Sequence, residues 1–257
     1  MSLAAQVGHI AWRAVIRTSR QPANVVFPFV FPTALLAVTS AGLSAATQLP
    51  GFPSASFLAF FLAFPFIQGA LFATMNAGTD LARDIQTGFL NRLALTPMRG
   101  SALVAGQLGG IALMGLVQAI FYLGIGLAAG VRLESGVPGA FVLLALATLI
   151  AIAFGALGAF FALRTGSSES VQGLFPLLFV LLFLSSMALP RNLIEQDWFR
   201  TVATYNPVSY LIEGIRSLLV TGWDGEALAL GFGVALAILV AGLAGASAAL
   251  KTRLVRT

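Results

Sequence analysis

Long apolar runs separated by short polar segments dominate this chain. A helix needs about 20 apolar residues to cross a bilayer, and six runs reach about that length. We expect spans at residues 25–46, 56–78, 101–130, 138–163, 171–189 and 227–250. The pattern therefore predicts an all-α integral membrane protein in which residues 1–257 form a single transmembrane domain.

Residues 1–22 show a different pattern, that of a basic amphipathic helix. Polar residues share one face and apolar residues the other, with Trp12 at the border. Such a helix lies flat among lipid headgroups. Pro22 is expected to end it. The polar face consists of Gln6, His9, Arg13, Arg17 and Arg20.

Residues 80–99 form the longest polar interruption in the first two-thirds of the chain. Thr79 or Asp80 is suited to cap the start of a helix there, since acidic side chains stabilise the positive N-terminal end of a helix. Gly88 is a point where the chain can bend, and the residue before Pro97 disfavours helix. The pattern predicts a short amphipathic helical elbow. An ordinary solvated loop is the alternative.

Residues 190–226 carry two shorter amphipathic patterns, at 193–203 and 208–219, separated by Tyr205-Asn206-Pro207. Neither is long enough to span a bilayer. Glu213 and Arg216 are spaced to pair at i, i+3. We expect a re-entrant helix pair before the last span, because such backbone is tolerated where protein buries it.

Composition agrees with a membrane protein: 58% of residues are hydrophobic and 9% charged, against about 25% charged in soluble domains. Cys is absent, which excludes disulfides and thiol chemistry. The net charge of +5 is better explained by membrane topology than by a nucleic-acid partner.

The distribution of basic residues predicts the orientation, because positive charge concentrates in cytoplasmic segments. With both termini in the cytoplasm, ten basic residues lie inside and four outside. The inner ones are Arg13, Arg17, Arg20, Arg83, Arg92, Arg99, Arg164, Lys251, Arg253 and Arg256; the outer ones are Arg132, Arg191, Arg200 and Arg216. Residues 80–99 are therefore expected in the cytoplasm.

The predicted spans hold almost no ionisable groups, which disfavours a proton- or ion-coupled pump. Their polar residues suit hydrogen bonds between helices or a weakly polar substrate path. Candidates for that path are Gln68, Asn76, Gln118 and Tyr122. No phosphate-binding loop is present, since Lys251 is the only lysine. We expect no catalytic residue, no metal site and no cofactor on this chain.

Two motifs resemble those of a known family. GFLNRLALTPMRGSALVAGQ, at residues 88–107, is similar to the cytoplasmic signature of type 2 ABC transporter permeases, in particular the daunorubicin-resistance drug exporters. YNPVSYLIEGIRSLL, at residues 205–219, is similar to the segment before the last span of that family. The resemblance covers nearly the whole chain.

The resemblance implies a multi-pass permease of the prokaryotic cytoplasmic membrane. Two permeases, either two copies or a copy and a paralogue, would pair with two ABC ATPase subunits that hold ATP and Mg. It also implies roles for particular residues. ATPase coupling would fall to Asp80, Asp84, Gly88, Phe89, Arg92, Thr96 and Pro97, and an outer gate to Tyr205, Asn206, Pro207, Glu213 and Arg216.

The function expected is outward movement of an amphipathic drug-like or lipid-like molecule, driven by ATP hydrolysis on the partner subunit. Three alternatives stay open from the sequence: a stand-alone channel or secondary transporter, an assembly or scaffold subunit, and export of a lipid-linked glycan.

Overall fold

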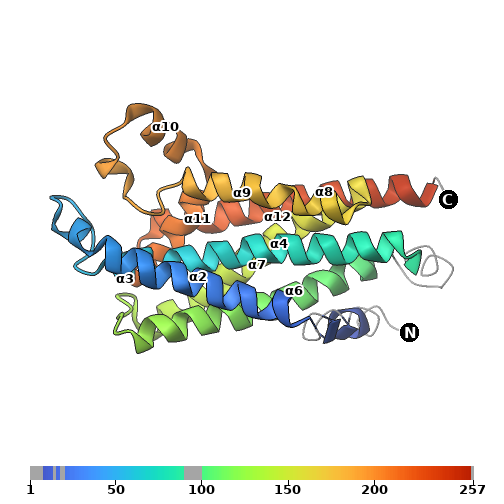
Figure 1. Ribbon diagram of the computed structural model, residues 1–257, viewed down its shortest axis with the longest axis horizontal. Helices are drawn as coiled ribbons and strands as arrows, with labels where there is room; N and C mark the ends of the chain where they lie inside the picture. Colours follow the sequence, from blue (N-terminus) through green and yellow to red (C-terminus); the bar gives the residue numbers. More distant parts are fainter. Residues whose placement is uncertain (1–7, 14–15, 18–20, 90–99, 256–257) are drawn as a thin grey trace.

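The computed structural model describes residues 8–13, 16–17, 21–89 and 100–255, in which every regular element is a helix. Figure 1 shows the long helices lying side by side in a bundle. The all-α prediction is confirmed. Five helical segments of these residues are long and apolar enough to cross a membrane: Val25–Gly42, Phe57–Gln86, Ala105–Ala128, Gly136–Thr165 and Gly225–Arg253.

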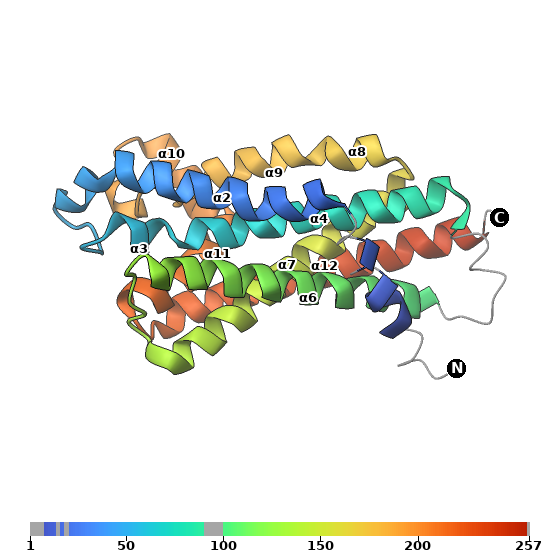
Figure 2. The same ribbon diagram turned by 60° about the horizontal axis from the view of Figure 1, so that its bottom comes forward.

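The two ends of the bundle differ in charge. Helices α4 (Ala63–Gln86) and α12 (Gly225–Val255) finish at the same end, close to residues 8–13 and 16–17 (Figures 1 and 2). Helix α7 (Gly136–Thr165) also finishes there, since Arg253 of α12 donates a hydrogen bond to the Leu163 carbonyl. We call this the basic end; its described cations are Arg13, Arg17, Arg83, Arg164, Lys251 and Arg253. The opposite end carries α10 (Asp197–Tyr205) and α11 (Pro207–Arg216).

Helix α7 is the centre of the bundle, packing most extensively against α4 and α12 and also against α6 (Gly100–Ala128). Lipid provides no hydrophobic drive between helices, so small residues that allow close backbone approach decide such contacts. A Cβ placed at Gly78 of α4 would lie 2.8 Å from the carbonyl oxygen of Gly158 in α7. One at Gly158 would overlap the Thr74 carbonyl oxygen. The α4–α7 contact therefore requires glycine.

Helix α2 (Pro22–Gly42) contains two internal prolines, Pro28 and Pro32. Pro32 has no N–H, so the Pro28 carbonyl one turn earlier lacks its helical partner. The hydroxyl of Tyr122, from α6, donates to that carbonyl, and Tyr122 is only 2% exposed. Pro22 is the first residue of α2, where a missing N–H costs nothing, and Gln21 before it is not helical. The end of the N-terminal helix, which Pro22 was expected to set, lies outside the described residues.

The second predicted span, 56–78, ends too early. Ser56 caps the short helix α3 (Phe57–Phe61), and α4 continues as helix to Gln86. Asp80 is therefore an interior residue of α4 and not a cap. The acids do not stop the helix because arginines from the N-terminal segment neutralise them, as described below.

The fifth predicted span, 171–189, is not one long helix. It is divided into α8 (Ser168–Gln172) and α9 (Leu174–Phe183), which run in line along the bundle (Figure 1). Pro176 cannot donate to the Gln172 carbonyl, which explains the break. After Phe183 the backbone leaves the helix because Ser186 and Met187 bond to side chains of α11.

The other predicted spans match helices to within a few residues: 101–130 is α6, 138–163 is α7, and 227–250 lies within α12. The segment 25–46 covers α2 and part of a 3-10 turn, Ser44–Gln48. In residues 190–226 a 3-10 turn at Arg191–Leu193 precedes α10 and α11, and a π-helical turn at Ser217–Thr221 follows them.

We predict that Gly158→Ala lowers the thermal stability of the purified protein. The added methyl group would push α4 from α7, at a cost of about 1–3 kcal/mol. Gly233→Ala on α12 is the matched control, because nothing lies within 4 Å of a Cβ there and alanine favours helix. Thermal unfolding in detergent should show a lower midpoint for Gly158→Ala alone; equal midpoints would contradict the packing argument.

Candidate functional site

Two acids of α4 meet two arginines at the basic end. Asp80 and Asp84 lie one helical turn apart, as do Arg13 and Arg17. Arg13 donates to both oxygens of Asp84, at 3.1 Å each. Arg17 donates to Asp84 at 2.9 Å and lies 3.2 Å from Asp80. Asp84 is only 8% exposed, and a carboxylate so buried needs such partners.

These ion pairs attach the N-terminal segment, residues 8–13 and 16–17, to the bundle. Ile10 packs against a small apolar cluster that includes Leu81. A Cβ at Gly109 of α6 would lie 3.3 Å from the Ala11 Cβ, so the segment also lies against α6. The sequence predicted a polar face turned to water and headgroups, whereas Arg13 and Arg17 turn to α4.

The predicted coupling segment 80–99 is described only as far as Phe89. Helix α4 ends at Gln86; the Thr87 N–H then donates to the Arg83 carbonyl, and Gly88 follows with φ +69°. This left-handed conformation is the usual reason for glycine after a helix. Phe89 lies under the guanidinium of Arg13, 4.1 Å from its centre. The remaining predicted coupling residues, Arg92, Thr96 and Pro97, lie outside the described residues.

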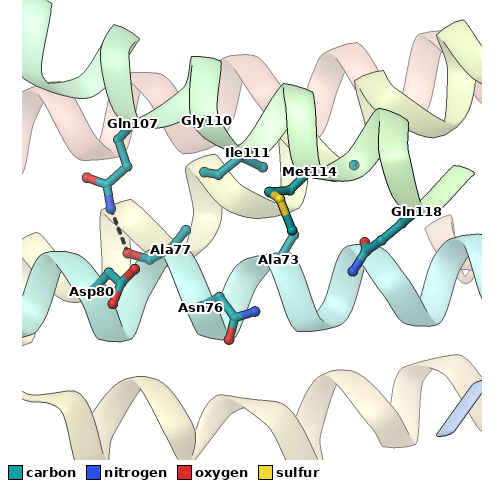
Figure 3. A pocket seen from close by; sticks show the side chains of 10 residues that line it. Ala73, Asn76, Ala77, Asp80, Gln107, Gly110, Ile111, Met114 and Gln118 are labelled. Atoms are coloured by element: carbon teal, nitrogen blue, oxygen red, sulfur yellow. Dashed lines mark hydrogen bonds between the residues drawn. The ribbon is translucent and has the colours of Figure 1, made fainter. Parts of the chain in front are cut away.

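A small cavity of about 50 Å³ separates the basic-end halves of α4 and α6. In Figure 3 Gln107 reaches from α6 to α4, where its amide donates to the Ala77 carbonyl at 2.9 Å. Asp80 closes the same side of the cavity. The lining residues are Ala73, Asn76, Ala77, Asp80, Gln107, Gly110, Ile111, Met114, Gly115 and Gln118.

The four predicted path residues do not lie together. Asn76 and Gln118 line this cavity. Gln118 also lines a smaller one of about 10 Å³, together with Tyr122. Gln68 lines neither of them. It is fully buried, and neither polar atom of its amide has a hydrogen-bond partner within the described residues.

Arg216 is buried at the opposite end, with 7% exposure. It donates to the carbonyls of Phe60, Ser186 and Met187 at 3.1, 3.0 and 2.9 Å, and it stacks on the Phe60 ring. Burial lowers its pKa to about 9, while the charge of Glu213 acts in the opposite direction. The guanidinium therefore stays protonated at pH 7 and joins α3, α11 and the turn after α9.

Glu213 does not form the predicted ion pair with Arg216. It pairs with Arg191, which donates through Nε at 2.8 Å, and it accepts from the Ser186 hydroxyl at 2.8 Å. Arg191 also lies over the Tyr210 ring, 4.4 Å from its centre. The i, i+3 spacing would allow the Glu213–Arg216 pair on an exposed helix face. Arg216 instead turns inward, to the carbonyls of Phe60, Ser186 and Met187.

The Tyr205-Asn206-Pro207 break builds the start of α11. The Asn206 side chain accepts from the Val208 N–H at 2.9 Å and donates to the Leu181 carbonyl at 2.6 Å. Asn206 thus caps α11 and holds it to α9. Pro207 occupies the first helical position, and Tyr205 is 82% exposed.

A larger cavity of about 450 Å³ opens at this end. Phe60 and Pro53 form an apolar wall, and Arg191, Glu213 and Arg216 lie along the cavity. Two of the predicted gate residues, Glu213 and Arg216, thus share one cavity. Their role as a gate stays a prediction.

Residues 5–220 match the family described as ABC-2 type transporter. The chain belongs to this family. The resemblance seen in two sequence motifs is thereby confirmed, and so is the expectation of a membrane-spanning transport protein. The ABC permease family implies a separate ABC ATPase as partner. The ABC-2 match includes both the acid pair of α4 and the residues of α11.

Several curated relatives carry names of drug-resistance permeases. The daunorubicin resistance ABC transporter permease protein DrrB1 of Streptomyces coeruleorubidus is 27% identical over 85% of this chain and 76% of its own length. The probable doxorubicin resistance permease DrrC of Mycobacterium tuberculosis is 28% identical over 56% of this chain. The putative transport permease ycf38 of Porphyra purpurea is 30% identical over 58%. This chain spans about half the length of the last two.

Sequence reasoning missed the partners of the charged residues. Arg13 and Arg17 were assigned to the headgroups, although their spacing of four equals that of Asp80 and Asp84. That match was a usable signal, because residues four apart share a helix face. Nothing comparable pointed to Arg191 as the partner of Glu213.

We predict that Ala11→Cys and Gly109→Cys together form a disulfide on mild oxidation, since their Cβ atoms would be close enough and the natural chain has no cysteine. Adding Asp84→Asn should lower the yield severalfold, because it removes the partner of Arg13 and Arg17. The control pair is His9→Cys with Gly109→Cys, as His9 is exposed. Gel mobility measures the yield; equal yields with and without Asp84 would contradict this attachment.

We also predict that Arg216→Lys destabilises the protein by about 1.5–3 kcal/mol, the range for hydrogen bonds to a charged group. Lysine keeps the charge but lacks the planar fork that reaches separate carbonyls. Arg200→Lys is the control, because Arg200 is half exposed and pairs with Asp197. Thermal unfolding should separate the two variants, and a midpoint for Arg216→Lys equal to that of Arg200→Lys would refute the role assigned to the fork.

Proposed function

We propose that this chain is the membrane permease subunit of a prokaryotic ABC exporter. It would move an amphipathic drug-like or lipid-like molecule out of the cell, using ATP hydrolysed by a separate subunit. The observation that carries the proposal is the ABC-2 match over residues 5–220. The names of the daunorubicin and doxorubicin resistance relatives support the choice of substrate class.

The energy source follows from the residues that the sequence contains. The sequence has no phosphate-binding loop, and Lys251 is the only lysine in it. ATP and Mg would therefore be held by the partner. The complete exporter would contain two ABC ATPase subunits and a second permease, which is either another copy of this chain or a paralogue.

The basic end would face the cytoplasm, because it collects six of the described cations. Helices α8 and α9 would then together make the fifth crossing along the chain, which brings the total to six. Residues 168–183 would span about 24 Å as helix, and the turn after Phe183 would cover the rest of a core about 30 Å thick. This arrangement would place both termini in the cytoplasm.

ATPase docking would use the segment that joins α4 to α6 at the basic end. Asp80 and Asp84 lie in the last two turns of α4, and Gly88 and Phe89 follow its end. Arg92, Thr96 and Pro97 follow in the same segment. Several ion pairs hold α4 to the N-terminal segment. A push by the ATPase on the docking segment would therefore move α4 and the N-terminal segment together.

The opposite end would form the exit. α10 and α11 are too short to cross a bilayer, and the 450 Å³ cavity between α11 and Pro53 opens there. We propose that Glu213 and Arg216, with Tyr205, Asn206 and Pro207, support an outer gate. The buried carbonyl contacts of Arg216 support this role, since they tie α11 to the turn after α9.

The direct test of the proposal is co-expression with the ABC ATPase encoded nearest to the gene. The two proteins should co-purify, and inside-out membrane vesicles containing both should accumulate doxorubicin only when ATP is supplied. Accumulation without ATP, or by the permease alone, would refute the proposal and favour a channel or secondary transporter.

We predict that Gly88→Val reduces ATP-driven accumulation severalfold. Valine at a left-handed φ is strained, so the chain would leave α4 in a different direction and misplace the docking segment. Gly130→Val is the matched control: Gly130 has φ +88°, nothing lies within 4 Å of a Cβ added there, and it follows the end of α6 at the opposite end of the bundle. Transport in vesicles, normalised to protein in the membrane, measures both; equal losses would show only general backbone strain.

A further inference from the structure

The structure assigns a cation-recognition role to the cavity between α4 and α6. We propose that it binds the ammonium group of an amphipathic amine, with Asp80 as counter-ion and Arg17 as an internal competitor for the same carboxylate. This inference rests on the proposed export function and specifies its substrate class.

Asp80 is the only charged residue among the ten that line the cavity (Figure 3). The amide groups of Gln107 and Gln118 form a polar part of the cavity wall, and the side chains of Ile111 and Met114 form an apolar part. A volume of about 50 Å³ exceeds the roughly 10–15 Å³ that a cavity needs to hold one water molecule. The cavity therefore has room for an ammonium group.

Asp80 is the less firmly held of the two acids. Among the described residues Arg17 lies 3.2 Å from Asp80, and the charges of Arg83 and Arg13 also act on this carboxylate. Asp84 has two contacts from Arg13 and a shorter one, 2.9 Å, from Arg17. Arg17 can therefore release Asp80 while remaining bound to Asp84.

Release of Arg17 would create a demand for another cation. The Asp80 side chain is only 16% exposed, and a carboxylate that is largely buried without a partner is costly. An ammonium group has three donors, which suit one carboxylate together with neighbouring amide oxygens. If a substrate amine replaces Arg17 beside Asp80, the carboxylate keeps one positively charged partner and the net charge around it does not change.

The apolar part of such a substrate would lie outside the cavity. Leu113 and Val117 neighbour Met114 and Gln118 on α6, and both are exposed, at 45% and 44%. In a bilayer this surface would face acyl chains or a bound apolar group. The site therefore fits a molecule with one positively charged amine on a hydrophobic body.

The test uses the purified full-length chain in phosphatidylcholine nanodiscs at pH 7, with 1-pyrenemethylammonium and uncharged 1-pyrenemethanol as matched fluorescent probes. Anisotropy, corrected with empty nanodiscs, gives each dissociation constant. The ammonium probe should bind about tenfold more tightly than the alcohol, as one charge-assisted hydrogen bond would provide. Equal affinity for both probes would overturn the inference.

Substitutions at the two charged residues should act in opposite directions. Asp80→Asn should abolish the preference for the ammonium probe, Asp80→Glu should retain most of it, and Arg17→Gln should raise the affinity about threefold or more by removing the competitor. Asp197→Asn, an exposed acid on α10, should change nothing. If Arg17→Gln loses binding as Asp80→Asn does, the ion pair is only structural and the inference fails.

The inference and the proposed function fail separately. If the protein exports doxorubicin with ATP but shows no preference for the ammonium probe, the export function stands and the cation site is overturned. If the protein binds the ammonium probe selectively but shows no ATP-driven export, the cation site stands and the proposed export function is overturned.

Discussion

The contact between α4 and α7 is the constraint on which the rest of the bundle depends. Because lipid gives helices no hydrophobic reason to associate, close packing must hold them, and the α4 and α7 backbones meet at Gly78 and Gly158. The neighbouring contacts of α7 use small residues in the same way, Gly115 toward α7 from α6 and Gly242 from α12. Once α7 is central, the places of α4, α6 and α12 follow.

Charged groups then set the position of α4 at its two ends. At the basic end Arg13 and Arg17 neutralise Asp80 and Asp84. At the other end Arg216 donates to the carbonyl of Phe60, just before α4 begins. Buried ions without partners are far more costly than paired ones, so sliding α4 along its axis would leave a charge unpaired at one end or the other.

How much the sequence predicted depended on the range of the interactions. Apolar run length placed α6, α7 and α12 within a few residues, because crossing a bilayer is a local requirement. It misplaced the end of α4 and the end of the helix at Phe183, since both depend on partners far along the chain: Arg17 for the first, and Ser209 and Arg216 for the second. The break between α8 and α9 follows instead from the local Pro176, which run length alone does not register. The site showed the same division. Asp80, Asp84, Glu213 and Arg216 were recognised as candidates, whereas Arg13, Arg17 and Arg191 were not recognised as their partners.

Asp80 occupies a position shared by three features of the molecule. It lines the α4–α6 cavity, it pairs with the N-terminal segment, and it lies two turns before Gly88, which follows the end of α4. A ligand that takes Asp80 from Arg17 therefore weakens the attachment of the N-terminal segment beside the proposed ATPase-docking segment. Because coupling free energies between binding sites are reciprocal, a partner that pulls this segment from α4 would in turn make Asp80 more available to a cation. One carboxylate would thus connect substrate binding to ATPase docking.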